Sequence, residues 1–170
     1  MKLEKRYDAD RIRERVAELA EALDRAFREK PPVLISVLKG SSFFLADLAR
    51  KMTLPVSCEF ISVQRAEGSD EILQMDFSTG FPVVGQPVLL LKDVVYSGIV
   101  ESYLMESLKV GGADSVGLVA IIDKPAERRT EVSADYSLFS TEGGIFVGYG
   151  MEHRGNFAHL PYIAEIVGEQ

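Results

Sequence analysis

The chain has 170 residues, enough for one domain, and its 46% hydrophobic and 26% charged residues are typical of a globular protein, not of a disordered or collagen-like one. Its formal net charge of −7 argues against nucleic acid as a partner, because an acidic surface repels a polyanion. A small phosphorylated ligand remains compatible with this charge, since backbone N–H groups at a helix start attract anions locally.

The sequence gives no sign of export or of a membrane. Its single cysteine, Cys58, cannot form an intramolecular disulfide, so we expect a cytoplasmic location. The N-terminal residues lack the apolar core of a secretory signal, and no apolar run approaches the ~18 residues of a membrane span. Cys58 precedes an apolar strand and is interpreted as a small core residue. His153 and His159 lie in a polar segment and are predicted to be surface residues.

The first half of the chain predicts a helix followed by strand–loop–helix. Apolar residues spaced by three and four predict an amphipathic helix from Asp8 to Lys30, capped by Asp8 or Asp10 and stopped by the prolines at 31 and 32. The apolar run 33–38 predicts a buried strand, and 43–52 has a helical pattern. A second buried strand is predicted at 59–63, and residues 64–80 are interpreted as a flexible loop or a hairpin.

The second half repeats the alternation of strand and helix. Val88–Leu91 is the core of a strand buried on both faces, residues 94–98 form a turn, and the next helix runs to the glycines at 111 and 112. Further strands are predicted at 115–122, 136–139, 145–148 and 162–167. This order predicts a single α/β domain, residues 1–170, with a mainly parallel sheet and helices on both faces. Ligands of such sheets bind at the carboxyl ends of the strands.

Two of those strand ends have residues suited to an anion. Lys39-Gly40-Ser41-Ser42 combines a lysine, a glycine that permits close backbone approach and a helix start, and Tyr96-Ser97-Gly98 opens the next helix. Each segment could equally be an ordinary strand-to-helix turn. The dinucleotide motif G-x-G-x-x-G, the P-loop and a Cys/His zinc spacing are all absent from the sequence.

Five segments in order resemble the hypoxanthine-guanine phosphoribosyltransferases of purine salvage. They are VLKGS (37–41), LLLKDVVYSGIV (89–100), IIDKPAERR (121–129), FVGYG (146–150) and LPYI (160–163). The resemblance implies a type I phosphoribosyltransferase fold with a small hood, partly C-terminal. It also implies a reaction in which a 6-oxopurine and phosphoribosyl pyrophosphate give a nucleoside monophosphate and pyrophosphate. Mg²⁺ is the implied cofactor, and a homodimer or homotetramer the implied assembly.

The resemblance also assigns roles to individual residues. Leu38, Lys39 and Gly40 are similar to the pyrophosphate loop, where the family often has a non-proline cis peptide. Ser97, Gly98 and Ile99 resemble the cradle of the 5′-phosphate, and Lys124 resembles the lysine that donates to the exocyclic oxygen of the purine. The implied ligand-binding residues are completed by Lys92, Asp93, Val100, Ile145, Phe146 and Val147, and the implied magnesium ligands are Glu152 and Asp93.

Several positions depart from the family pattern. Where the family has three acids around the end of the strand, this chain has Lys92, Asp93 and Tyr96. Tyr96 replaces the acid that accepts the purine proton, and a phenol with a pKa near ~10 is a poor base at neutral pH. Alternatively, Asp93 serves as the base. Further replacements are Val100 for a hydroxyl residue, Ile145 for the stacking ring, with Phe146 beside it, Glu152 for a magnesium-binding aspartate, Ala158 for an arginine, and Arg65-Ala66 for Ser-Tyr.

These departures lead to three hypotheses, the third being an interaction subunit without a ligand, which would show no nucleotide-dependent rise in melting temperature. The first is a hypoxanthine-guanine phosphoribosyltransferase homologue in which transfer is weak or lost. The second is a non-catalytic regulatory protein that binds a purine nucleotide or phosphoribosyl pyrophosphate. Phosphoribosyl transfer in addition to ligand binding would support the first hypothesis, and binding without transfer would support the second.

Overall fold

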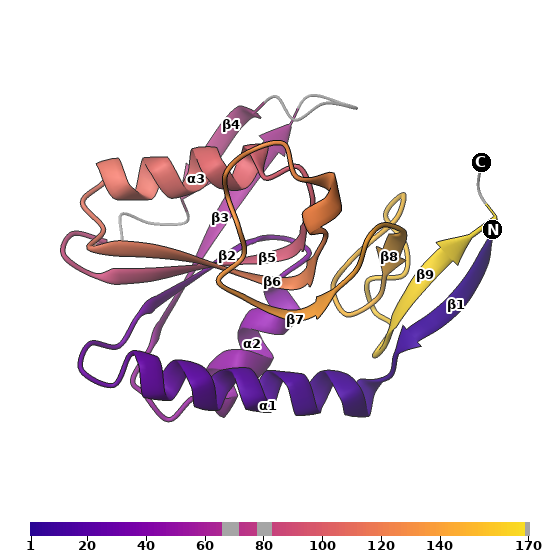
Figure 1. Cartoon of the computed structure of the whole chain (residues 1–170), viewed down its shortest axis with the longest axis horizontal. Coiled ribbons are helices and arrows are strands. Elements are labelled where there is room, and N and C mark those ends of the chain that lie inside the picture. Colours follow the sequence, from indigo (N-terminus) through magenta and orange to yellow (C-terminus); the bar gives the residue numbers. More distant parts are fainter. Residues whose placement is uncertain (66–71, 78–82, 169–170) are drawn as a thin grey trace.

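The central sheet of the protein is shown in Figure 1, from a computed structural model that describes residues 1–65, 72–77 and 83–168. Its strand order is β4-β3-β2-β5-β6-β7. Five strands are parallel: β2 (Val33–Leu38), β3 (Ser57–Arg65), β5 (Pro87–Val95), β6 (Ser115–Asp123) and β7 (Tyr136–Ser140). β4 (Ile72–Phe77) pairs antiparallel with β3 at one edge. The predicted mainly parallel sheet is confirmed.

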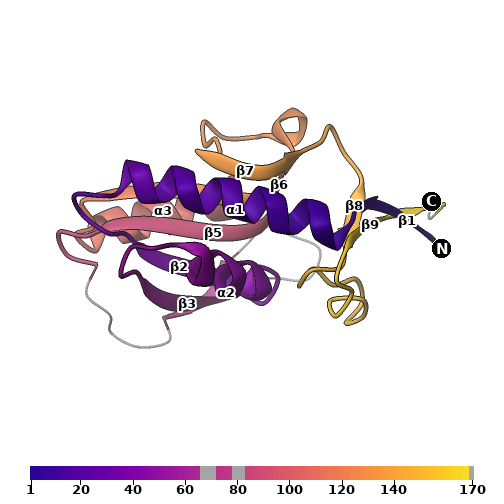
Figure 2. The ribbon, with the colours of Figure 1, turned by 90° about the horizontal axis from the view of Figure 1, so that it is seen from below.

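Helices cover both faces of this sheet, as Figures 1 and 2 show. α1 (Ala9–Ala26) and α2 (Ser42–Lys51) pack on one face and α3 (Ile99–Val110) on the other. Each side has its own cluster of buried hydrophobic side chains. In β5, Leu89 and Leu91 belong to the cluster below α1 and α2, whereas Val88 and Leu90 belong to the cluster below α3. The uninterrupted apolar run in the sequence follows from this burial on both faces.

α1 begins where the sequence predicts and ends earlier. Asp8 is its N-cap, and the Asp8 carboxylate accepts a hydrogen bond of 2.8 Å from the backbone N–H of Arg11. The helix ends at Ala26 with Phe27 as the C-cap, not at Lys30. Residues 28–30 are charged and bring no further apolar side chain to the buried face, and the prolines that follow favour an extended chain before them.

A second, three-stranded antiparallel sheet forms the hood, in the order β1-β9-β8. It consists of β1 (Lys2–Tyr7), β8 (Ile145–Val147) and β9 (Ile163–Val167), and Figure 1 shows both chain ends beside it. The expected C-terminal contribution to a hood is confirmed. β1 was not predicted, because its mainly polar residues show neither a buried run nor a clear alternation.

Three further expectations are corrected or refined. β5 extends to Val95, so the predicted turn at 94–98 begins later. Cys58 is exposed, not in the core, because β4 pairs only with residues 61–65 of β3 and leaves the start of β3 at the surface. For residues 64–80 the hairpin alternative is confirmed where the chain is described, and residues 66–71 and 78–80 lie outside the described ranges. None of the helices in the described ranges is long and apolar enough to span a membrane.

Candidate active site

The candidate site is a cavity of about 400 Å³ on the hood side of the central sheet. Its lining brings together predicted site residues from four parts of the chain: Leu38, Lys39, Gly40, Lys92, Asp93, Val100, Phe146 and Glu152. The remaining predicted site residues are not in this lining: Tyr96, Ser97, Gly98, Ile99, Lys124, Ile145 and Val147. Most of the predicted residues outside it belong to the loop that opens α3 or to the Lys124 region.

The loop after β2 approaches β5 closely. The peptide bond between Leu38 and Lys39 is cis, which agrees with the family resemblance. A Cβ atom on Gly40 would lie 2.0 Å from Asp93 Oδ2, so this position accommodates glycine alone while Asp93 keeps its place. The loop backbone therefore lies directly against the Asp93 carboxylate.

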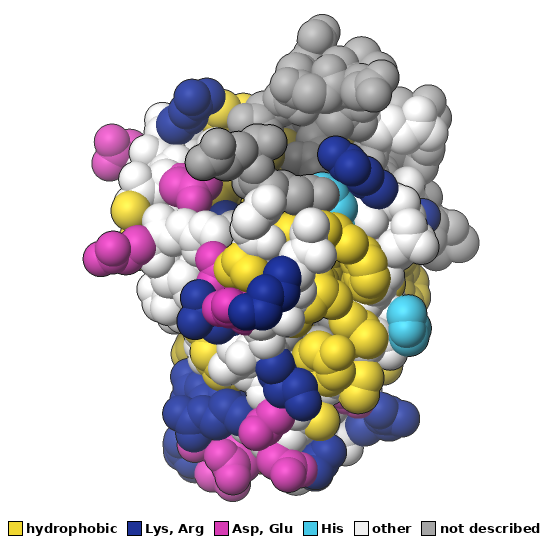
Figure 3. All heavy atoms as spheres, turned by 90° about the vertical axis from the view of Figure 1, so that its right-hand side faces the viewer, with side chains coloured by type: hydrophobic (Ala, Val, Ile, Leu, Met, Phe, Trp, Pro, Cys, Tyr) yellow, Lys and Arg dark blue, Asp and Glu magenta, His cyan; other side chains and the backbone are white. Residues whose placement is uncertain are grey.

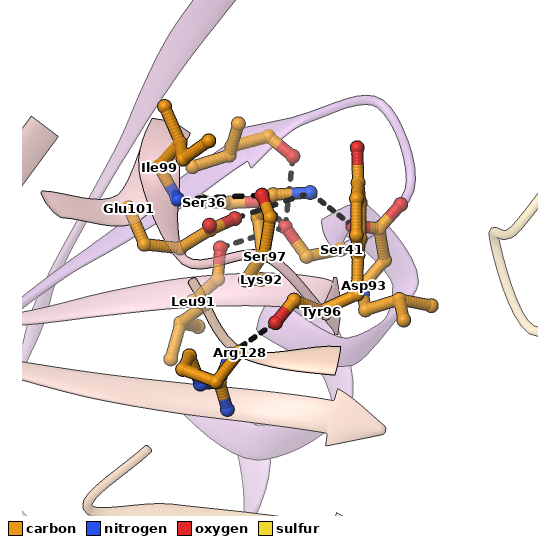
Figure 4. A network of polar contacts seen from close by, with 12 residues as sticks. Ser36, Ser41, Leu91, Lys92, Asp93, Tyr96, Ser97, Ile99, Glu101 and Arg128 are labelled. Carbon is orange, nitrogen blue, oxygen red and sulfur yellow. Dashed lines mark hydrogen bonds and ion pairs between the residues drawn. The ribbon is translucent and has the colours of Figure 1, made fainter. Parts of the chain in front are cut away.

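Ser41 anchors this loop from below. Its buried hydroxyl lies 2.9 Å from the carbonyl oxygen of Val37 and 3.0 Å from that of Leu91, and 2.8 Å from the hydroxyl of Ser36. These contacts join the ends of β2 and β5, and Figure 4 shows them at the base of the site. The loop and the β5 end are thus held in one unit.

The loop between β5 and α3, which sequence analysis predicted to hold an anion, leads directly into the N-terminus of α3. Gly98 is the N-cap of α3 and has a φ of 78°, in the left-handed region that favours glycine. The backbone N–H of Ile99 lies 3.4 Å from the Ser97 hydroxyl. The first N–H groups of a helix lack carbonyl partners within the helix, and the helix dipole adds positive potential there.

A segment that follows β6 braces this loop. Arg128 donates a 3.0 Å hydrogen bond to the carbonyl of Tyr96 and forms an ion pair with Asp123. The Arg129 backbone N–H donates to the carbonyl of Ser97 at 2.9 Å. Sequence analysis quoted these arginines within a motif but assigned them no role, because the contacts depend on how the segment after β6 folds back.

Lys92 lies between two carboxylates. Its ammonium group is 2.5 Å from Asp93 Oδ1 and 3.9 Å from Glu101 Oε1, and all three appear in Figure 4. Lys92 and Glu101 are both buried, with 10% and 5% of their side chains exposed. Burial alone raises the pKa of a carboxyl group, but the Lys92 ammonium outweighs it and holds the pKa of Asp93 below its ordinary value.

Glu101 is a site residue that sequence analysis missed. It lies on the same buried face of α3 as Leu104 and Leu108. In the sequence, Glu101 stands three residues before Leu104 and seven before Leu108, so it shares a helix face with two leucines predicted to be buried. A charged side chain on such a face needs a partner. Its spacing alone did not indicate that the partner is Lys92 on the neighbouring strand.

Tyr96 is half-buried at the end of β5, where the resemblance places the catalytic acid. Its carbonyl is held by Arg128. In Figure 4 its ring stands away from Arg128, on the side of the network where Asp93 lies. The position therefore carries a phenol in place of a carboxylate.

Lys124 and the aromatic ring of Phe146 form the opposite part of the site. The Lys124 ammonium donates to the carbonyl of Gly144, lies 3.4 Å from Glu127 and is 5.8 Å from the centre of the Phe146 ring. Phe146 is buried and lines the cavity, whereas Ile145 is 51% exposed and Val147 is fully buried. Ile145 has no ring and is not in the cavity lining, whereas the Phe146 ring lines the cavity.

The two carboxylates that the resemblance assigns to magnesium each lie beside a lysine. Asp93 pairs with Lys92, and Glu152 lies 3.9 Å from the ammonium of Lys39. Across residues 1–65, 72–77 and 83–168, no group of three or more His, Cys, Asp or Glu side chains is placed to hold a metal ion. A divalent cation at Asp93 does not fit this donor set. Ala66 lies outside the described residues.

Comparisons with known proteins agree with this architecture. Residues 5–154 match the family model of the phosphoribosyl transferase domain. The hypoxanthine-guanine phosphoribosyltransferase of Bacillus subtilis is 31% identical over 160 residues, which cover 91% of this chain and 87% of the relative. The bifunctional protein TilS/HprT of Listeria monocytogenes is 32% identical over 160 residues, which cover 91% of this chain but only 24% of that longer protein.

A solved structure gives the same result for the fold. The hypoxanthine-guanine phosphoribosyltransferase of Bacillus anthracis superposes with a TM-score of 0.89 at 28% identity, covering 98% of this chain and 100% of that chain. The chain belongs to the phosphoribosyl transferase family, and within it to the hypoxanthine-guanine phosphoribosyltransferases.

Proposed function

We propose that the chain is a purine-salvage-type phosphoribosyltransferase homologue whose transfer activity is weak or lost. The intact reaction joins N9 of hypoxanthine or guanine to C1 of phosphoribosyl pyrophosphate, breaks the bond from C1 to pyrophosphate and releases a proton from the purine. The single observation that carries the proposal is the end of β5, where Lys92 neutralises Asp93 and Tyr96 stands in place of an acid.

The phosphate-binding parts support retained binding. The glycine of the loop after β2 lies against Asp93, and Gly98 holds the loop before α3 in the conformation that opens the helix toward an anion. Both features are made by the backbone, so they do not depend on the replaced side chains. Ser97, Gly98 and Ile99 are the proposed 5′-phosphate site, and Leu38, Lys39 and Gly40 the proposed pyrophosphate site.

The side chains at the positions of the family's catalytic residues are the reason to expect slow phosphoribosyl transfer. A positioned general base contributes roughly 10²–10⁴-fold in rate, and a protonated phenol does not supply it. Asp93 is a poor substitute, because its pKa is held low by Lys92 and a carboxylate of low pKa is a weak base. The ammonium of Lys92 cannot accept a hydrogen bond from a ribose hydroxyl.

The base site supports a preference for 6-oxopurines. Lys124 is a donor only, so it suits the exocyclic oxygen of hypoxanthine or guanine and opposes the amino group of adenine. Phe146 lines the cavity and is the proposed ring beside the base, in place of Ile145. Val100, which also lines the cavity, lacks the hydroxyl that would bind phosphate.

The second candidate is a regulatory protein that binds a purine nucleotide or phosphoribosyl pyrophosphate without turnover. The intact backbone cradle beside the altered β5 residues favours it specifically. Isothermal titration with inosine 5′-monophosphate, combined with a steady-state assay of hypoxanthine and phosphoribosyl pyrophosphate, separates the candidates. We expect binding together with a rate at least about 10²-fold below that of the Bacillus subtilis relative. A comparable rate would contradict the loss, and absence of nucleotide binding would contradict both candidates.

The assembly and location stay predictions. We propose a homodimer or homotetramer in the cytoplasm. Seen from the hood end in Figure 3, hydrophobic side chains gather near the centre of the face, with most of the charged ones below and to the left of them. Such a patch on a family member favours self-association. Light scattering of the purified protein across a tenfold dilution tests this, and a monomer at all concentrations would contradict it.

A further inference from the structure

The charges around the cavity are balanced among the side chains themselves. Four charged residues line it: Lys39, Lys92, Asp93 and Glu152. They form two pairs, with ammonium-to-carboxylate distances of 2.5 Å for Lys92 and Asp93 and 3.9 Å for Lys39 and Glu152. The described lining therefore has no excess negative charge that would attract a divalent cation.

The first pair is built into the core of the site. Lys92 and Glu101 are almost fully buried, and the second carboxylate approaches Lys92 from α3, on the other side from Asp93. A buried carboxylate is stable only when it is paired, so Glu101 and Lys92 require one another. The Lys92 ammonium thus lies between the Asp93 carboxylate on its own strand and the Glu101 carboxylate on α3.

This ammonium lies beside the Asp93 carboxylate, which the family resemblance assigns to magnesium. A divalent cation on the free side of Asp93 would stand within a few ångströms of Lys92, and at such distances two cations repel strongly in a partly buried site. The backbone of Gly40 closes the Oδ2 side of Asp93. Both the charge and the available space disfavour a metal at this carboxylate.

We propose that the Lys92 ammonium takes the place of a divalent cation at Asp93, so that the cavity binds the pyrophosphate group of phosphoribosyl pyrophosphate without divalent metal. The inference rests on the proposed function for the identity of the ligand. Lys39 on the pyrophosphate loop lines the same cavity, and its 80% exposed side chain, 3.9 Å from Glu152, places a second ammonium group there. The backbone N–H groups of the two loops complete the anion site.

The test is the metal dependence of ligand binding. Isothermal titration measures the dissociation constant of phosphoribosyl pyrophosphate in EDTA and in excess Mg²⁺ for wild-type protein and for Lys92→Glu/Glu101→Leu. The double substitution makes an acidic pair at positions 92 and 93 and removes the buried carboxylate that would lose its partner, with a side chain of similar volume. Lys109→Glu, an exposed lysine at the end of α3, is the matched charge control.

We expect wild type and Lys109→Glu to bind in EDTA no more than about threefold more weakly than in Mg²⁺. The double variant should lose at least about tenfold in EDTA relative to Mg²⁺, because the two acids repel the free pyrophosphate. An added Mn²⁺ titration read by electron paramagnetic resonance should show no tight site in wild type and a new one in the double variant.

The binding results distinguish a failure of this proposal from a failure of the proposed function. Wild-type binding that needs Mg²⁺ by tenfold or more overturns this proposal and leaves the proposed function standing. A wild type that binds neither phosphoribosyl pyrophosphate nor inosine 5′-monophosphate overturns the proposed function as well. If the double variant does not fold, the wild-type ratio and Lys92→Met/Glu101→Leu, which should also lose binding in EDTA, still decide the matter.

Discussion

The two loops proposed to bind phosphate and the strand end beside them are built by different means. In the loops at 38–40 and 96–99 the backbone would form the site, through Gly40 packed against Asp93 and Gly98 at positive φ. At the end of β5 the side chains of Lys92, Asp93 and Tyr96 form it. A binding site formed by backbone groups is kept when its side chains are replaced. A site formed by side chains is lost when they are replaced. Changes in the side chains at the end of β5 can therefore reduce the chemistry and leave ligand binding by the loops intact.

The largest effect is expected from disturbing the backbone cradle. Gly98→Val places a β-branched residue at φ 78° and a Cβ atom 2.4 Å from Thr130 Oγ1. We expect inosine 5′-monophosphate to bind about 100-fold more weakly by calorimetry, since about two charge-assisted hydrogen bonds are lost. Gly85→Val is the control, because Gly85 also has positive φ but has open space around its Cβ position. Equal losses in both variants would show that the cradle is not the phosphate site.

Removing the brace should have the next largest effect. Arg128→Leu leaves the Asp123 carboxylate, which is 16% exposed, without its guanidinium. We expect a loss of about 2 kcal/mol in the free energy of unfolding by urea and weaker nucleotide binding. Arg129→Leu is the matched control, because Arg129 is exposed and contributes its backbone N–H to Ser97. Unchanged stability in Arg128→Leu would mean that the brace does not hold the loop.

A smaller effect is expected at the base site. Lys124→Met should weaken hypoxanthine binding about tenfold, as expected for one lost hydrogen bond from a charged donor, and should strengthen adenine binding, because the donor that opposes the adenine amino group is removed. Calorimetry with the two bases measures this, with Lys109→Met as the control. Adenine binding more tightly than hypoxanthine in wild type would contradict the role of Lys124.

The smallest effect is a pH dependence at the side-chain site. Because the folded pKa of Asp93 lies below its unfolded value, its ion pair stabilises the fold above the unfolded pKa of about 3.9 and this contribution is lost as the pH falls through the folded pKa. The difference in unfolding free energy between wild type and Asp93→Asn should therefore shrink below about pH 4. A difference that stays constant from pH 6 to pH 3, roughly the window around that pKa, would contradict the pairing with Lys92.

The sequence predicted those parts of the fold that depend on local pattern. β2, β5 and β6 are buried on both faces, so their apolar runs are continuous and easily recognised. β1 was missed because its stability comes from pairing with β9 at the other end of the chain, as in Glu4 opposite Glu165. Cys58 was misplaced because exposure at the start of β3 depends on how far β4 extends.

The candidate site was predictable to the same degree. The ordered motifs located both loops, Lys92, Asp93 and Lys124, and the cavity brings several of these residues together. Glu101 and Arg128 were missed, since each acts on a residue of another element through tertiary packing. Sequence spacing shows which residue types are present, but it does not show which buried charges pair.

We propose that the protein still binds its ligand but transfers the phosphoribosyl group weakly or not at all. The transfer rate of Tyr96→Asp tests this most directly. The assay follows hypoxanthine and phosphoribosyl pyrophosphate in buffers with and without Mg²⁺, with Tyr96→Phe as the control. We expect Tyr96→Asp to exceed wild type by at least about tenfold, because it restores a proton acceptor, and Tyr96→Phe to match wild type. Adding Lys92→Glu together with Glu101→Leu, which removes the carboxylate that would lose its partner, should increase the rate by more than the separate changes predict. A wild type as fast as the Bacillus subtilis relative, slowed by Tyr96→Asp, would contradict the account.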